Sequence, residues 1–129
     1  MTATYRPTPQ VSALDGMTPL GIAPQKTLEE RVLEWTEQLV QALEANYDSR
    51  YPNSSDPVRF SIESGRKYWK IMQNHGGVHA FIDKKTGEVY KPASWRGPAK
   101  GVRYDLRIIR ERGECLLRAD WAGGYLYMR

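Results

Sequence analysis

From Leu28 onwards, hydrophobic residues recur with the spacing of an α-helix. Leu28, Val32, Trp35 and Leu39 follow one another at intervals of four and three residues. The residues between them are mostly polar, and many of them are acidic. This period predicts a helix over residues 28–47, with one apolar face and an acidic outer face.

The residues before this helix carry a start signal. Thr27 stands three residues before Glu30, in the order Thr27-Leu28-Glu29-Glu30. The threonine hydroxyl can accept from the Glu30 N–H while the glutamate carboxylate accepts from the Thr27 N–H, which is a capping box. We therefore expect the helix to begin directly after Thr27.

From residue 58 onwards the period changes from helical spacing to strand alternation. Val58, Phe60 and Ile62 alternate with polar residues, as in a half-buried strand. The segment 83–87, DKKTG, predicts a hairpin in which the glycine follows a type I turn with positive φ. The first strand is expected to end at Gly65, and three further strands are expected over residues 67–72, 78–82 and 88–93.

The C-terminal third gives weaker signals. Residues 102–109 fit strand or helix, and their alternation slightly favours a strand. We expect a short helix over 111–121, stopped by Gly123 and Gly124, and a final strand over 125–128. The predicted fold class is α+β: a small antiparallel β-sheet of about four to five strands, one long N-terminal amphipathic helix and a short C-terminal helix.

Composition bounds the protein further. Forty per cent of its 129 residues are hydrophobic, which suffices for one core, and no apolar run approaches the ~20 residues of a membrane span. The start of the chain lacks the layout of a signal peptide. Four of the eight prolines lie before residue 25, so we expect an extended arm over 1–26 and a single domain over 27–129. A single cysteine excludes an internal disulfide.

Charge is distributed unevenly along the chain, whose formal net charge is +4. Residues 1–65 carry five Lys and Arg against nine Asp and Glu, whereas residues 66–112 carry twelve against four. A cationic middle beside an acidic N-terminal part favours a polyanion-binding surface or attraction between the two parts, and a merely solvated face is the alternative.

The basic half of the chain contains a long motif that resembles sequences of a known family. The run VHAFIDKKTGEVYKPASWRGPAKGVRYDL, followed by RADWAGGYLY, resembles a widespread family of small uncharacterised proteins of tailed bacteriophages. Many members have KAPAKG where this chain has residues 96–101, RGPAKG, and the resemblance covers residues 66–127. It implies a phage source and a location in the host cytoplasm or the virion, and it implies no reaction.

Candidate chemistry is sparse. His75 and His79 have the spacing of two metal ligands on a helix, but two glycines between them break that helix, so we expect no metal site. His79 remains available for contact with an anionic partner. Glu88 and Lys91, three apart on a strand, point to opposite faces and do not form a nuclease site. We expect Cys115 to be a buried thiol and the protein to have no catalytic activity and no cofactor.

The basic loop and its flanks are the best candidate site. Lysine and arginine neutralise phosphates, and a ring beside them can stack on an unpaired base. The residues predicted to bind nucleic acid are Lys91, Trp95, Arg96, Lys100, Arg103 and Arg107, extended by Lys84 and Lys85 at the hairpin tip. Trp95 is alternatively a core residue, as are Trp69 and Trp121.

Two functions follow from this pattern. The first is a nucleic-acid-binding accessory protein that acts on phage or host DNA or RNA without catalysis. The second is a protein-interaction module, either associated with the virion or bound to a host factor. A homodimer through the helix at 28–47 is one form of the second function, since its apolar face is wide for a lone domain.

Overall fold

The computed structural model describes residues 25–127, so all but the last two residues of the expected arm over 1–26 lie outside the described part. The first element is α1, Leu28–Arg50, one turn longer than the period predicted. The Thr27 hydroxyl accepts from the Glu30 N–H at 3.1 Å, and the Glu30 carboxylate accepts from the Thr27 N–H at 2.8 Å. The predicted capping box is confirmed.

The capping box gives a first testable prediction. Replacing Thr27 by alanine removes the hydroxyl acceptor and is expected to lower the free energy of unfolding by about 1 kcal/mol. Urea unfolding followed by circular dichroism measures this change. Replacing Thr27 by serine keeps the hydroxyl and serves as the control. Equal losses in the two variants would show that the hydroxyl contact does not stabilise the helix start.

After α1 the chain forms one antiparallel sheet in which each strand pairs with the next, in the order β1-β2-β3-β4-β5. The strands are β1 Phe60–Ser64, β2 Tyr68–Gln73, β3 Val78–Asp83, β4 Glu88–Tyr90 and β5 Tyr104–Asp105. In the hairpin between β3 and β4, Gly87 has φ +75° and its N–H donates to the Asp83 carbonyl, as expected from DKKTG. The α+β fold class predicted from the sequence is confirmed.

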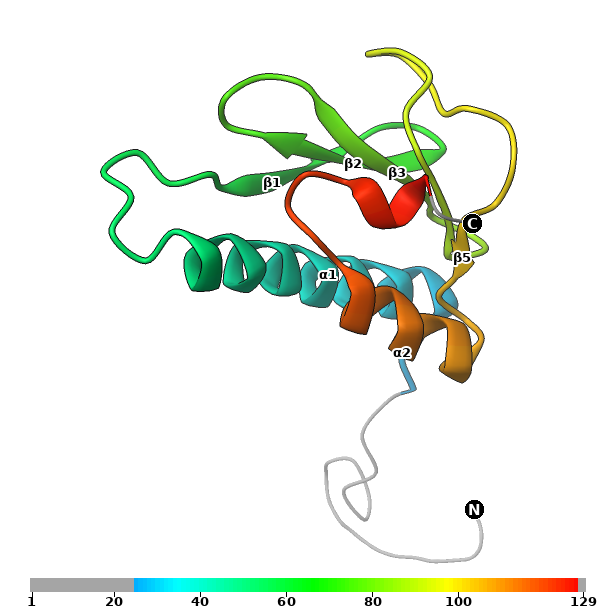
Figure 1. The fold of residues 1–129 in the computed structure, drawn as a ribbon. Coiled ribbons are helices and arrows are strands. Elements are labelled where there is room, and N and C mark those ends of the chain that lie inside the picture. Colours follow the sequence, from blue (N-terminus) through cyan, green and yellow to red (C-terminus); the bar gives the residue numbers. More distant parts are fainter. Residues whose placement is uncertain (1–24, 128–129) are drawn as a thin grey trace, which may run out of the picture.

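The core lies between α1 and one face of the sheet. Figure 1 shows α1 running across this face, with α2, Ile109–Arg118, beside it. Strand register puts Ile62, Ile71 and Ala80 in one row, facing α1. The buried residues of α1 are Val32, Thr36, Leu39, Leu43 and Tyr47. Because these residues are covered by the protein's own core, they are not available for pairing with a second copy of α1.

The C-terminal part differs most from expectation. Only Tyr104–Asp105 of the segment 102–109 is strand, and α2 ends at Arg118 rather than at residue 121. The expected final strand is wrong over its described part, which is a 3-10 helix, Gly124–Leu126. The Asp120 carboxylate is the physical reason, because it accepts from three backbone N–H groups of this turn, those of residues 122, 124 and 125.

Within residues 25–127, none of the helices has the length and apolar character that crossing a bilayer requires.

Candidate nucleic-acid interface

The face of the sheet opposite α1, here called the outer face, carries a row of aromatic rings. Lys70, Phe81 and Tyr90 are register partners on three neighbouring strands, and Tyr68 lies beside them. The Tyr68 ring packs edge-on against Phe81 and Tyr90, with centroid distances of 5.7 Å and 6.1 Å. Phe81 is only 2% exposed although it points away from the main core. The outer face therefore has its own small apolar floor.

The loop after β4 brings a fourth ring to this floor. Pro92 and Pro98 form an isolated bridge, and the N–H groups of Ala93 and Ser94 donate to the Gly97 carbonyl. This tight turn lies on the side of the sheet away from α1 (Figure 1) and carries Trp95. The Lys70 ammonium lies 5.3 Å from the centre of the Trp95 ring and 5.8 Å from that of Phe81.

The sequence left Trp95 as either a nucleic-acid-binding residue or a core residue, and its exposure decides between the two. Trp95 is 57% exposed and is not a core residue, whereas Trp69 and Trp121 are partly buried against the core. A cation over one side of the indole and open solvent elsewhere leave ring surface for an incoming planar group.

Two hollows join the floor to the hairpin tip. One, of about 190 Å³, is lined by two of the floor rings, Tyr68 and Phe81, by the carboxylate-bearing Glu63, and by the cations Arg66, Lys67, Lys70 and Arg96. The other, of about 390 Å³, is lined by Arg66, Lys67, Lys84 and Lys85 together with Glu29 and Asp83. Both hollows share Arg66 and Lys67, so they form one surface that runs from the outer face round the edge of the sheet towards the start of α1. We call it the basic strip, which consists of Arg66, Lys67, Lys70, Lys84, Lys85 and Arg96, with Tyr68 and Trp95 as its rings.

Most cations of the basic strip have no carboxylate partner. Among the ion pairs of residues 25–127, none involves Arg66, Lys67 or Arg96. Lys70 lies 3.9 Å from the exposed Glu63, at the outer limit of an ion pair. Lys84 donates to the Ser64 hydroxyl and lies over the Trp69 ring. The strip is thus free to attract anions.

The structure brings together half of the residues that the sequence predicted for nucleic-acid binding. Trp95, Arg96, Lys84 and Lys85 belong to the basic strip. The others lie outside it. The Lys91 ammonium lies 4.4 Å from the centre of the Tyr127 ring. Lys100 is exposed and lines neither hollow. Arg103 is half-buried, and its backbone N–H donates to the Val89 carbonyl.

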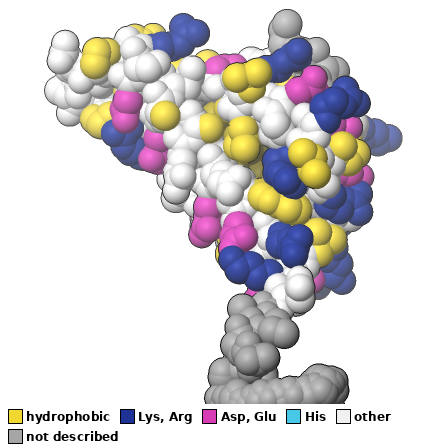
Figure 2. Space-filling view, turned by 90° about the horizontal axis from the view of Figure 1, so that it is seen from below, with side chains coloured by type: hydrophobic (Ala, Val, Ile, Leu, Met, Phe, Trp, Pro, Cys, Tyr) yellow, Lys and Arg dark blue, Asp and Glu magenta, His cyan; other side chains and the backbone are white. Residues whose placement is uncertain are grey.

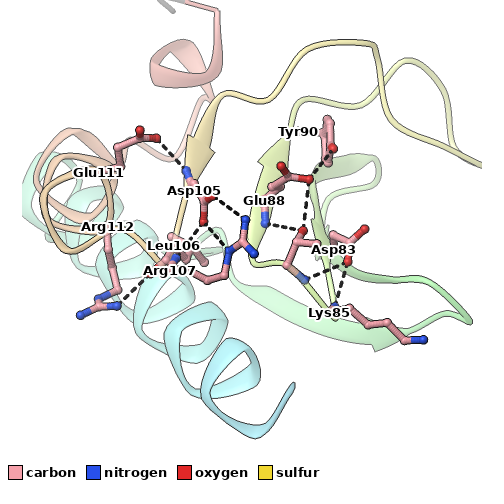
Figure 3. Close-up of polar contacts among 10 residues, drawn as sticks. Asp83, Lys85, Glu88, Tyr90, Asp105, Leu106, Arg107, Glu111 and Arg112 are labelled. Atoms are coloured by element: carbon pink, nitrogen blue, oxygen red, sulfur yellow. Dashed lines mark hydrogen bonds and ion pairs between the residues drawn. The ribbon is translucent and has the colours of Figure 1, made fainter. Parts of the chain in front are cut away.

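Arg107 is held in a different, acidic environment. Its Nη2 and Nε donate to the two oxygens of Asp105 at 2.9 Å and 3.2 Å (Figure 3). The bonds from Arg107 hold the pKa of the Asp105 carboxyl below its usual value. Glu88 lies opposite Asp105 in the strand register and accepts from the Tyr90 hydroxyl. These carboxylates limit the basic strip on the side of β4 and β5.

Tyr90 is kept neutral at this border. Burial, followed by the hydrogen bond to Glu88, raises the pKa of its phenol to about 12. With its hydroxyl proton donated to Glu88, Tyr90 contributes an aromatic ring and no negative charge next to the basic strip.

Arg66, Lys67, Tyr68 and Lys70 were missed from the sequence. Arg66 and Lys67 lie in the turn between β1 and β2, where no alternation indicates direction. For Tyr68 and Lys70 a signal existed, since both alternate with Trp69 and Ile71 along β2. Assigning Ile71 to the core would have put Tyr68 and Lys70 together on the outer face.

The histidines do not form an anion or metal site. His75 lies 3.2 Å from the Asp56 carboxylate, whereas His79 is buried with its Nε2 2.9 Å from the Tyr125 hydroxyl. Burial lowers the pKa of His79 to about 4, so its ring is neutral at pH 7. The expectation that His79 contacts an anionic partner is therefore wrong.

The structure also bears on possible metal ligands and on the single cysteine. Within the part of the chain that the structure covers, no group of three His, Cys, Asp or Glu residues is arranged to hold a metal ion. Cys115 is fully buried in α2, so the prediction of a buried thiol is confirmed.

Comparison with known proteins adds the family and no function. No curated protein and no solved structure matches the chain. One family model matches residues 22–128, which include all the elements described above. The chain therefore belongs to a family of unknown function, DUF7717.

Proposed function

We propose that this is a phage-encoded accessory protein that binds single-stranded nucleic acid on the basic strip, without catalysis, in the host cytoplasm or the virion. One observation carries the proposal: the half-exposed Trp95 ring packs against the Lys70 ammonium, at one end of a run of cations in which Arg66, Lys67 and Arg96 form no ion pair within residues 25–127. The phage source rests on the resemblance of residues 66–127 described above.

Each part of the basic strip has a role in this proposal. Arg66, Lys67 and Arg96 contact successive phosphates, and each contact releases condensed counterions. The open part of the Trp95 ring stacks on an unpaired base, and such stacking tolerates any base. Lys70 holds the indole in place through a cation–π contact and places a positive charge beside it. Because stacking requires an unstacked base, the proposal favours single strands over duplexes.

Trp95 provides the test of this arrangement. Replacing Trp95 by alanine is expected to weaken binding of a fluorescent ~20-nucleotide single strand about 10-fold, the effect of losing one stacked base. Fluorescence anisotropy measures the affinity. Trp95→Phe keeps a ring and should lose less than the alanine variant.

Tyr127 offers a matched control for this test. Its ring is 61% exposed, and it lies outside the basic strip, against Lys91. Tyr127→Ala should bind as the unaltered protein does. If Trp95→Ala also bound with unchanged affinity, the indole would not contact nucleic acid and this proposal would lose its main support.

The alternative of a protein-interaction module is favoured by a separate observation, the exposed apolar side chains of α2. This surface shares no residue with the basic strip.

A further inference from the structure

The side of α2 that faces solvent is apolar at its centre. Ile109, Gly113 and Leu117 are spaced four apart, so they lie in one row along the helix. Ile109 is 77% exposed and Leu117 is 86% exposed, whereas Cys115 on the opposite side is fully buried. Two large apolar side chains therefore project into solvent from a ten-residue helix, with a glycine between them.

Gly113 has no explanation in the fold of the isolated chain. A glycine inside a helix is less favourable than an alanine. Gly113 does not have the positive φ that would require glycine, and a Cβ built on it would meet no atom within 4 Å. The absence of a side chain leaves a notch between Ile109 and Leu117. A notch of this kind lets another backbone or an apolar side chain approach the helix closely.

A hollow continues this row beyond Leu117. It has a volume of about 510 Å³, lies between the C-terminal ends of α1 and α2, and is lined by Tyr51, Leu117 and Trp121 among others. Tyr51 is 48% exposed, and its ring packs edge-on against Trp121 at 5.9 Å. The notch and this hollow form one docking face with two apolar positions.

Positive charge borders the docking face. Arg110 and Arg118 are exposed on α2, and Arg50 and Arg118 line the hollow. Asp120, which also lines the hollow, already accepts from three backbone N–H groups. Figure 2 shows hydrophobic and Lys or Arg side chains intermingled on the side of the molecule where α2 lies, with some Asp or Glu side chains among them. Glu114, which is half-buried, stands four residues from both Arg110 and Arg118. The border thus carries three arginines against the carboxylates of Glu114 and Asp120, and this excess of positive charge favours an acidic partner.

We propose that α2 docks an acidic amphipathic helix of a partner protein. One apolar side chain of that helix sits over Gly113, between Ile109 and Leu117, and a second enters the hollow beside Tyr51 and Trp121. Carboxylates on the flanks of the partner helix pair with Arg110, Arg118 and Arg50. This is recognition of a helix by a groove, read through apolar anchors one or two turns apart.

Two other classes of partner fit the docking face less well. A bilayer surface covers convex apolar side chains, but it does not fill a concave hollow lined by rings. A nucleic acid has no apolar group for Ile109 and Leu117, which occupy the centre of the face. A protein helix satisfies both the apolar centre and the cationic border.

The test uses a synthetic peptide, because the partner protein is unidentified. The probe is a fluorescent helical peptide of about 18 residues, with leucines on one side and glutamates on the other. The control peptide has lysines in place of the glutamates. Full-length protein is titrated into each, and binding is followed by anisotropy. We expect the acidic peptide to bind in the range of about 1–100 µM and the basic peptide not to bind.

Variants of the docking face make the test specific. Gly113→Gln fills the notch and should weaken peptide binding about 10-fold, while the better helix propensity raises the melting temperature. Leu117→Ser should weaken binding by a similar factor. The double variant Arg66→Glu/Arg96→Glu, which alters only the basic strip, should bind the peptide with unchanged affinity. That last result separates this proposal from the proposed function.

Three outcomes would overturn the proposal. The first is no binding of the acidic peptide at about 1 mM. The second is binding of the acidic peptide that Gly113→Gln and Leu117→Ser leave unchanged. The third is binding to phosphatidylserine vesicles or to an oligonucleotide that Leu117→Ser abolishes, in place of peptide binding.

Discussion

Replacing Arg66 and Arg96 together by glutamate is expected to weaken binding of a ~20-nucleotide single strand about 100-fold at 50 mM salt. Both guanidinium groups line the same hollow beside Lys70 and Phe81, and neither has a carboxylate partner within residues 25–127. The double variant therefore loses two phosphate contacts and places two negative charges against the nucleic acid. Fluorescence anisotropy of a labelled oligonucleotide measures the loss.

A control for net charge is available on α2. The double variant Arg110→Glu/Arg118→Glu changes the charge of the protein by the same amount, on exposed residues that do not line the basic strip. It should lose only the small part of the affinity that arises from the overall field. Equal losses in both double variants would mean that nucleic acid is attracted by net charge without a defined site.

The second large effect is a loss of stability in acid that arises from His79. The folded protein holds the pKa of His79 at about 4, because burial disfavours the charged ring, whereas the ordinary value is 6.5. Protons therefore bind the unfolded chain more readily, so this contribution to stability is complete above pH 6.5 and is lost as the pH falls towards 4. The loss at pH 4 amounts to about 3 kcal/mol.

Urea unfolding at a series of pH values measures this effect against two variants. His79→Gln cannot take up the proton and should flatten the stability profile between pH 6.5 and 4. His75→Gln, which alters the exposed histidine beside Asp56, should keep the full slope because it leaves the buried His79 ring in place. A profile of His79→Gln parallel to that of the unaltered protein would show that the buried ring is not the source of the acid sensitivity.

The parts of the fold that the sequence predicted well depend on local interactions. The capping box at Thr27, the period of α1 and the DKKTG hairpin each involve residues within a few positions of one another. The C-terminal turn was mistaken for a strand because its conformation depends on the Asp120 carboxylate. The alternation of tyrosine with leucine and methionine over residues 125–128 does not reveal that contact.

The candidate site was only half predicted, for a related reason. Sequence identifies which residues are cationic, but their partners are set by the fold. Arg107 forms an ion pair with Asp105, and Lys91 lies over the Tyr127 ring. By contrast, Arg66 and Lys67, from a turn far away in the chain, complete the basic strip. The grouping of these charges follows from strand register, which hydrophobic alternation indicates only where one face is clearly apolar.

Affinity for a ~20-nucleotide single strand across a salt series tests the central claim most directly. If Arg66, Lys67 and Arg96 contact phosphates, the logarithm of the binding constant falls with the logarithm of salt concentration with a slope of about −2. That slope corresponds to a loss of about 16-fold between 50 and 200 mM salt. A slope near zero, or no binding at about 50 mM salt, would contradict the account.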